Sequence, residues 1–284
     1  MLIFLLKLAL TNYKVRTYIY GAIINYLMIF DRDAYQYASQ DGESSSVDDN
    51  SIFLQAIYEN NDTINRNYTG LMKIICSDSS DGHNITAMMG LSLLNKIIQL
   101  ADGHQQKWLN GISDNGYIKC IINSIAKTDN QLLEECFVSG ISNEKIIYIF
   151  ETKISLLITI ANDSYGAKLL LKNQLLDVLS SCSIFDLRSR FDGYSENNGG
   201  GINMNRLLLA NKYYQIFFPI LKLVITLLNA IGTDNSQVKS QVAQFVYCHA
   251  ETFSHLLRSK PFDLSMLEET RLVTSLLSKL APYD

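Results

Sequence analysis

Proline is scarce in this chain, with only three among 284 residues, at Pro219, Pro261 and Pro282. The strict alternation of apolar and polar residues that marks β-strands is also nearly absent, which argues against a sheet-based fold. Apolar residues instead recur at three- and four-residue spacing, as in amphipathic helices. Segments 18–30, 146–161 and 237–258 show this pattern, and we expect each to lie within one helix. The sequence therefore predicts an all-α protein.

Charged residues are also few in this chain. Only 18% of the residues are charged, 48% are hydrophobic and the net charge is −4. This composition excludes a disordered chain, which needs low hydrophobicity and high net charge. Binding to nucleic acid needs clustered Lys and Arg, and the nearest approach to a cluster is Arg188 with Arg190. We therefore expect no direct contact with nucleic acid.

The five cysteines form no CxxC pair, and their number is odd. These features argue against a disulfide framework or a disulfide-linked oligomer. Buried free thiols in a reducing compartment are expected instead. The cysteines are Cys76, Cys120, Cys136, Cys182 and Cys248.

Long hydrophobic runs are missing near the N-terminus. The runs Met1–Leu6 and Ile19–Phe30 are shorter than the roughly twenty residues that cross a bilayer, and no secretory cleavage signal follows the first. We expect no membrane span. Four N-glycosylation sequons are close to the number expected by chance, so a secreted or membrane-associated helical glycoprotein stays only as an alternative. The sequons begin at Asn61, Asn67, Asn84 and Asn162.

Catalytic motifs are absent from the sequence. No GxSxG, HExxH, P-loop or GxGxxG pattern occurs, so neither an enzyme nor a bound cofactor is predicted. Cys248 and His249 offer a nucleophile and a base, but adjacent helical residues point about 100° apart. We therefore expect no catalytic pair from these two residues.

One segment does gather candidate ligands. Cys76, Asp78, Asp81 and His83 fall within eight residues, and Asp102 and His104 follow. These residue types bind zinc, and a metal-dependent hydrolase built on Cys76, Asp81 and His83 is the corresponding hypothesis. However, no second ligand pair has standard spacing, and the calcium-loop pattern also fails. We therefore predict no metal site at these residues.

The favoured interpretation of the same segment is structural. Asp78 to Gly82 would end one helix, and His83 with Asn84 would begin the next. Trp108, the only tryptophan, is expected at an ordinary packing position. Three glycines are expected where helices end or turn, namely Gly103, Gly111 and Gly116.

Helix signals are clear further along the chain. Asp163–Ser164 is expected to cap a helix, and the last helix is expected over Leu264–Leu280. Tyr213–Leu228 is apolar around nearly its whole circumference and should be buried between neighbours. Pro219 lies inside it, and either kinks the helix or starts a second one.

Two stretches with few apolar residues are expected to be mobile loops. They divide the chain into a helical hairpin, a central helical block and a C-terminal helical block. The predicted boundaries are 1–30 for the hairpin, 31–50 for an acidic Ser-rich loop, 51–188 for the central block, 189–205 for an Asn/Gly-rich loop and 206–284 for the last block.

A single amphipathic helix buries too little apolar surface to repay the entropy of ordering it. Consecutive antiparallel helices solve this problem by stacking on one another. Because no repeat of fixed period occurs, the predicted architecture is an irregular α-helical solenoid, an ARM/HEAT-like superhelix. A generic helical-repeat adaptor is a further alternative at this point.

The order of the motifs resembles a known family. DGHNITAMMGLSLLNKIIQL at 81–100, HQQKWLNGISDNGYIKCIINSI at 104–125 and YYQIFFPILKLVITLLNAIG at 213–232 are similar to the C-terminal region of the large inner-ring scaffold nucleoporins, the 205-kDa class. The resemblance extends from about Lys14 to Pro282, and Ser189–Asn205 departs from the family's pattern. Since members of this family are several times longer, we expect the chain to be a C-terminal fragment of such a protein.

The resemblance implies a non-catalytic scaffold at the nuclear pore complex of the nuclear envelope. It implies a structural contribution to nucleocytoplasmic transport without a cofactor. It also implies binding to other inner-ring nucleoporins, namely linker nucleoporins of the 93-kDa and 35/53-kDa classes, through short helical segments.

Overall fold

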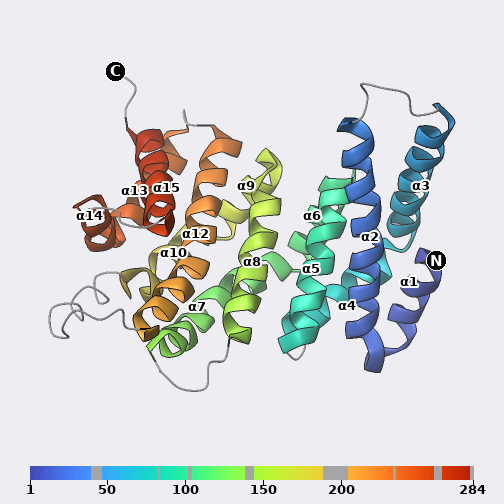
Figure 1. The fold of residues 1–284 in the computed structure, drawn as a ribbon, viewed down its shortest axis with the longest axis horizontal. Coiled ribbons are helices and arrows are strands. Elements are labelled where there is room, and N and C mark those ends of the chain that lie inside the picture. Colours follow the sequence, from blue (N-terminus) through green and yellow to red (C-terminus); the bar gives the residue numbers. More distant parts are fainter. Residues whose placement is uncertain are drawn as a thin grey trace. The chain divides into compact units, whose positions relative to one another are not determined.

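The computed structural model describes residues 1–39, 47–81, 84–101, 104–137, 144–187, 204–232, 235–258 and 264–281. Within these ranges the chain forms fourteen α-helices and two short 3₁₀ helices, and no strand occurs among them (Figure 1). The predicted all-α fold is confirmed. The described chain divides into two compact units, unit 1 over Met1–Tyr117 and unit 2 over Ile118–Asp284.

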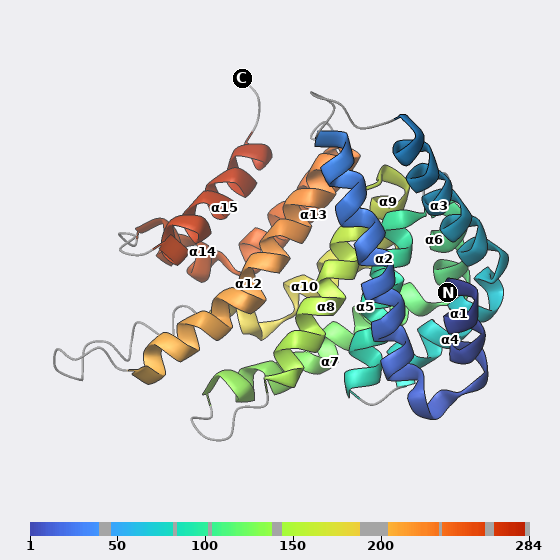
Figure 2. The same cartoon turned by 45° about the vertical axis from the view of Figure 1, so that its right-hand side comes forward.

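Unit 1 is built around α2, α4 and α5. Its elements are α1 (Leu2–Thr11), η1 (Tyr13–Val15), α2 (Arg16–Ser39), α3 (Val47–Arg66), α4 (Tyr68–Asp81), α5 (Asn84–Leu100) and α6 (Gln105–Asp114). Helix α5 packs against both α2 and α4, and α1 packs against α2 (Figure 2). The buried side chains between them are aliphatic, including Ile23, Leu27, Ile75 and Leu91. Each helix therefore buries its apolar stripe against a sequence neighbour or a near neighbour.

The predicted corner between two helices is confirmed. Helix α4 ends at Asp81 and α5 begins at Asn84, while residues 82–83 lie outside the described part. Trp108 is fully buried in α6, as expected for a packing residue, and its Nε1 donates to Asn65 Oδ1 at 3.2 Å. The ring of Tyr68 meets the indole edge-on, with 4.7 Å between ring centroids.

The prediction for Gly111 was wrong. This glycine lies inside α6 rather than at its end, and a Cβ atom built there would stand 1.7 Å from the Tyr68 hydroxyl oxygen. Gly111 instead marks a place where α6 packs closely against the side chains of Tyr68 and Met72 on α4. Gly116 follows α6 with a φ of +76°, as predicted for a helix end, and Gly103 lies outside the described residues.

Unit 2 packs around one long helix. Its elements are α7 (Tyr117–Phe137), α8 (Lys145–Ala161), α9 (Ser164–Lys172), α10 (Leu175–Ser180), η2 (Ser183–Asp186), α12 (Met204–Ile231), α13 (Ser236–Cys248), α14 (Ala250–Arg258) and α15 (Leu264–Leu280). Helix α12 contacts α8, α9, α13 and α15. Phe217, Leu221, Val224 and Leu228 of α12 are buried in these contacts.

Helix α12 runs through Pro219 without interruption, so Pro219 does not begin a second helix. Its stretch Ala210–Ile231 is long and apolar enough to cross a bilayer. The two runs considered in the sequence, Met1–Leu6 and Ile19–Phe30, are too short to do so. Half of the stretch Ala210–Ile231 is buried against the other helices of unit 2. This burial matches the prediction that Tyr213–Leu228 packs between neighbours, and a core helix accounts for the composition.

The single helix predicted over Gln237–Arg258 is wrong. The structure contains two helices there, α13 and α14, and the chain turns between them at His249, with φ −112° and ψ 30°. The apolar spacing continues across the break because both helices face the same core. Phe245, Phe253 and Leu256 are all buried, whereas Leu257 is exposed.

The predicted loops and the structure differ in extent. Helix α2 continues to Ser39 and α3 begins at Val47, so the loop predicted at 31–50 is helical at both ends. Helices extend readily once they are nucleated, and few apolar residues are needed at their ends. Residues 40–46 and 188–203 lie outside the described part, and α12 already includes 204–205. In the sequence, the boundary between the two compact units follows Tyr117, within the block predicted at 51–188.

The corner between α8 and α9 brings the backbones of the two helices close together. As predicted, Asp163 caps α9, where its Oδ2 accepts from the backbone N–H groups of Tyr165 at 3.0 Å and Gly166 at 3.2 Å. A Cβ atom at Gly166 would stand 2.0 Å from the backbone oxygen of Ile160. Since that oxygen belongs to the backbone of α8, it cannot rotate away as a side chain would.

We expect Gly166→Ala to destabilise the protein by about 2–3 kcal/mol, because the new methyl group must push α9 away from α8. Urea unfolding followed by far-ultraviolet circular dichroism measures the effect. Gly21→Ala in α2 is the control, since its Cβ would meet only the flexible Met89 Cε at 3.1 Å. Equal unfolding midpoints for the two variants would contradict the close approach at Gly166.

Candidate functional site

Three of the residues considered as metal ligands have described side chains, namely Cys76, Asp78 and His104. Cys76 and Asp78 lie on α4, the side chain of Asp81 and all of His83 and Asp102 lie outside the described part, and His104 is exposed at the start of α6. Among the residues that the structure describes, no group of three or more His, Cys, Asp or Glu side chains could hold a metal ion. Each described candidate instead has its own environment.

Asp78 holds three segments of unit 1 together. Its carboxylate oxygens accept from Arg16 Nη1 at 2.9 Å and 3.1 Å, and Oδ2 also accepts from the Tyr20 hydroxyl at 2.8 Å. Arg16 Nε in turn donates to the backbone oxygen of Ala9 at 3.1 Å. One carboxylate therefore ties α4 to α2 and, through Arg16, to the end of α1.

The chemistry of this network is that of a fixed structural contact. Burial, and then the hydrogen bond to the Asp78 carboxylate, raise the pKa of Tyr20 far above its usual value. Tyr20 therefore remains a protonated donor throughout the working range of pH. The Asp78 carboxylate accepts three hydrogen bonds, one at Oδ1 and two at Oδ2, and all three come from α2.

Cys76 is buried beside this network. Desolvation raises the pKa of its thiol to about 12, and desolvation followed by the nearby Asp129 charge does the same for Cys182. Both cysteines are therefore unreactive thiols. The expectation that the cysteines are buried was wrong for two others, because Cys120 and Cys248 are exposed on α7 and α13. The side chain of Cys136 lies outside the described part.

Cys248 and His249 lie in different surroundings, in line with their predicted divergence. The Cys248 sulfur is exposed and accepts from Gln244 Nε2 at 3.3 Å. The His249 ring is buried, with Nδ1 at 3.2 Å from Asp186 Oδ1 and Nε2 at 3.3 Å from the backbone oxygen of Leu179. Its ring packs against Phe185, with centroids 4.7 Å apart. His249 therefore fastens the α13–α14 turn to α10 and η2.

Two further acidic residues, which the sequence analysis did not single out, also make structural contacts. The Asp129 carboxylate on α7 accepts from the backbone N–H groups of Ser183 at 2.9 Å and Ile184 at 3.0 Å. Glu135 forms an ion pair with Lys212 of α12, with 2.8 Å between Oε1 and Nζ. Their partners lie more than fifty residues away in the sequence, so no local pattern could have revealed them.

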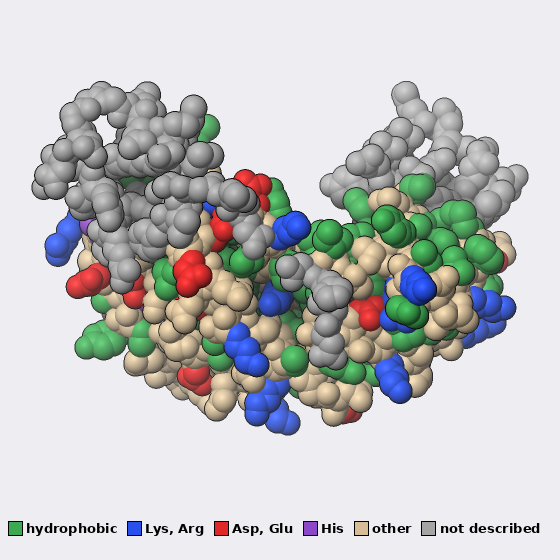
Figure 3. Space-filling view, turned by 90° about the horizontal axis from the view of Figure 1, so that it is seen from below, with side chains coloured by type: hydrophobic (Ala, Val, Ile, Leu, Met, Phe, Trp, Pro, Cys, Tyr) green, Lys and Arg blue, Asp and Glu red, His purple; other side chains and the backbone are tan. Residues whose placement is uncertain are grey.

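Exposed hydrophobic side chains of unit 1 lie on several elements, including α1, η1 and α2. Figure 3 shows hydrophobic side chains gathered over unit 1, at the right of that view. The exposed residues of α2 lie on one side of the helix at spacings of four, three and four, namely Tyr18, Ala22, Asn25 and Ile29, with Met28 beside the last. Tyr18 is 80% exposed, Ile29 58% and Met28 51%. No charged residue occurs between Arg16 and Asp31. We call these five residues the α2 face.

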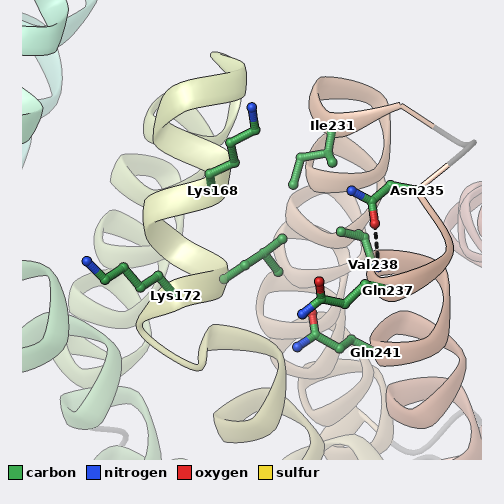
Figure 4. A pocket seen from close by; sticks show the side chains of 8 residues that line it. Lys168, Lys172, Ile231, Asn235, Gln237, Val238 and Gln241 are labelled. Carbon is green, nitrogen blue, oxygen red and sulfur yellow. Dashed lines mark hydrogen bonds between the residues drawn. The ribbon is translucent and has the colours of Figure 1, made fainter.

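Unit 2 contains a hollow between α9, the end of α12 and α13, with a volume of about 280 Å³ (Figure 4). Its apolar residues are Leu171, Ile231 and Val238, and its polar residues are Lys168, Lys172, Asn235, Gln237 and Gln241. Asn235 Oδ1 caps α13 by accepting from the Val238 N–H at 3.2 Å. We call this feature the α9–α13 hollow.

Comparison with known proteins relates the whole chain to one family. Residues 3–281 match the family described as nuclear pore complex scaffold, nucleoporins 186/192/205. The chain is 29% identical over 282 residues to the human nuclear pore complex protein Nup205, a match that covers 98% of this chain and 14% of the human protein. It is 26% identical over 218 residues to the Drosophila melanogaster protein of the same name, covering 75% of this chain and 10% of that protein.

We expect Asp78→Asn to destabilise unit 1 by about 2–3 kcal/mol, since Arg16 would be left partly buried without its counter-charge. Thermal and urea unfolding would measure the loss. Glu268→Gln is the control, because the Glu268–Arg271 pair is exposed on α15 and its removal should leave the midpoint unchanged. An unfolding midpoint for Asp78→Asn equal to that of the control would show that the Asp78 network does not contribute to the stability of the protein.

Thiol labelling should separate the cysteines by environment. At pH 8, a pKa of about 12 leaves roughly one thiol in ten thousand ionised, so Cys76 and Cys182 should resist iodoacetamide while Cys120 and Cys248 react. Peptide mapping by mass spectrometry after timed labelling reads out each residue. Labelling in urea is the control, in which Cys76 and Cys182 should react like the others. Rapid labelling of Cys76 in the folded protein would contradict its burial.

Proposed function

The chain belongs to the nuclear pore complex scaffold family of nucleoporins 186/192/205, and from this premise we propose that it is a structural segment of the inner ring of the pore. The observation that carries the proposal is the family match over residues 3–281, which includes helices of both compact units. The chain spans about a seventh of the length of the human relative, so partners and activity of a whole scaffold protein are part of the proposal.

We propose a structural rather than a catalytic role for this segment. The buried polar side chains described above are engaged in fixed contacts between helices, as Asp78, Asp129 and His249 illustrate. Such contacts hold helices in register and leave the outer helix faces for binding. A scaffold of this kind supports nucleocytoplasmic transport by keeping other pore proteins in place.

The partners that fit this role are linker nucleoporins of the 93-kDa and 35/53-kDa classes, bound through short helical segments. An amphipathic helix can lay its apolar side on an exposed helix surface and be held by packing alone. The α2 face has the required character, because it is uncharged and its large side chains are exposed. Its extent from Tyr18 to Ile29 is about 16 Å at 1.5 Å per residue, which is room for about three helical turns.

The centre of the α2 face favours close approach. Ala22 and Asn25 are the smallest side chains of the face and lie between Tyr18 at one end and Ile29 with Met28 at the other. A partner helix can therefore settle over Ala22 with its larger side chains beside it, as ridges fit into grooves. A charge placed at Ala22 would have to be desolvated in such a complex.

We expect Ala22→Glu to weaken binding of the linker segments at least about tenfold, because the buried carboxylate would have no partner. Isothermal titration calorimetry with the purified linker nucleoporins measures the change. Ala126→Glu on α7 is the matched control, since Ala126 is also exposed in the middle of a helix. Equal affinities of both variants and the wild type would rule out the α2 face as the docking surface.

The cellular test of the proposal is the position of the protein. A fluorescent tag at the chromosomal locus should give a continuous nuclear rim that coincides with other pore proteins. A diffuse cytoplasmic signal without a rim would overturn the proposed function itself, whatever the binding measurements show.

A further inference from the structure

We propose that the α9–α13 hollow binds a short acidic segment of a partner protein that inserts one large apolar side chain. This inference rests on the proposed function, in that a scaffold segment binds pieces of other proteins. It concerns a surface of unit 2 and is independent of the α2 face in unit 1.

The size and floor of the hollow fit a large apolar side chain. Its volume of about 280 Å³ is near the lower limit for pockets that enclose a small molecule. Its apolar floor consists of Val238, which is buried, with Leu171 and Ile231, which are both half-buried. The accessible surface of Leu171 and Ile231 would be removed from water by an inserted apolar side chain, which favours binding.

The wall opposite α9 offers groups that bind peptide backbone. Figure 4 shows Gln237 and Gln241 on α13 with their amides facing α9 across the hollow. Each amide supplies both donors and an acceptor, as a peptide backbone requires. Asn235 is already engaged as the cap of α13, so its role is to fix this wall in place.

The charge of the surroundings selects an acidic segment. Lys168 and Lys172 are exposed one turn apart on α9, and none of the eight lining residues is acidic. Neither α9 nor α13 contains an Asp or a Glu, and the N-terminal end of α13 adds a partial positive charge. The described acidic residues closest to α9 in the sequence are Asp163, which caps α9, and Asp177 on α10, and neither lines the hollow. Carboxylates on either side of the inserted side chain would therefore meet positive potential.

The lysines lie at the rim rather than in the floor. In Figure 4 the Lys168 ammonium stands at the upper edge of the hollow, and the Lys172 ammonium points away from it. Both stems are long, flexible and exposed, so each ammonium can turn toward a bound carboxylate without a buried charge being created. Rim charges of this kind mainly increase the association rate and make it depend on salt.

Other occupants fit the hollow less well. Two lysines are too few for a nucleic-acid backbone, whose binding rests on many phosphate contacts. A free inorganic anion would leave the apolar floor unused. An uncharged apolar segment would leave the lysines without a role. The combination of an apolar floor, an amide wall and a basic rim therefore favours the acidic segment.

The test uses the full chain and a short fluorescein-labelled peptide with a single Leu flanked by Glu residues. Two companion peptides carry Gln in place of every Glu, or Ser in place of the Leu. Fluorescence polarisation at low and near-physiological salt gives the affinities. We expect the Glu–Leu peptide to bind at least about tenfold more tightly than either companion, and its binding to weaken as salt increases.

Charge reversal then locates the site. Lys168→Glu combined with Lys172→Glu should weaken binding of the Glu–Leu peptide about tenfold or more. Lys119→Glu combined with Lys127→Glu is the matched control, since both residues are exposed on α7 and the net charge changes equally. Leu171→Trp fills the hollow and should also block binding, and circular dichroism shows whether each variant keeps its helices.

The outcomes separate this inference from the proposed function. Equal weakening by the α7 control would show attraction by net charge only and overturn the inference. Equal binding of the Ser peptide, or full binding to Leu171→Trp, would show that no side chain enters the hollow and would also overturn it. If the protein localises to the nuclear rim and binds linker segments but does not bind the Glu–Leu peptide, the inference about the hollow is overturned. The proposed function is unaffected by that result.

Discussion

An amphipathic helix in this chain cannot bury its apolar stripe alone, and the rest of the structure depends on that constraint. Ordering a backbone costs more free energy than one stripe recovers, so each helix requires a partner on at least one side. Helix α12 is the extreme case, because it is apolar on most sides and packs against α8, α9, α13 and α15. In unit 1 the same requirement is met by α5, which packs between α2 and α4. Stacked helices are the direct consequence.

Apolar packing drives the assembly of the helices but does not set their register. That task falls to a few buried polar contacts over long sequence distances. Asp78 receives hydrogen bonds from Arg16 and Tyr20, and His249 contacts Asp186 and the Leu179 carbonyl oxygen. A shift of one helix along another would leave these groups buried without partners, which is costly. The residues that first suggest chemistry are therefore the ones that specify the arrangement.

The sequence predicts the features of this fold that depend on neighbouring residues. The Asp163 cap, the last helix over Leu264–Leu280 and the burial of Tyr213–Leu228 all follow from local spacing, and the structure contains each of them. The break at His249 could not be predicted, because the apolar period continues through it and the contact made there, with Leu179, lies seventy residues away. The contacts of the Cys76–His83 segment could not be predicted for the same reason.

The Cys76–His83 segment shows the limit most clearly. Its residue types suggest ligands, and spacing alone argued against a metal site without saying what Asp78 does. The answer lies in Arg16, sixty-two residues earlier, which no local pattern connects to Asp78. The α9–α13 hollow is equally invisible in the sequence, because its lining residues come from α9, α12, α13 and the cap residue Asn235. A surface formed by several helices can be identified only from the three-dimensional structure.

The continuity of α12 through Pro219 has a mechanical consequence. Proline has no backbone N–H, so the helix already lacks one hydrogen bond at that point, and bending there breaks no further bond. At that point α12 is held by its neighbours α8, α9, α13 and α15 as well as by its own backbone hydrogen bonds, so its straight course depends on the packing of unit 2.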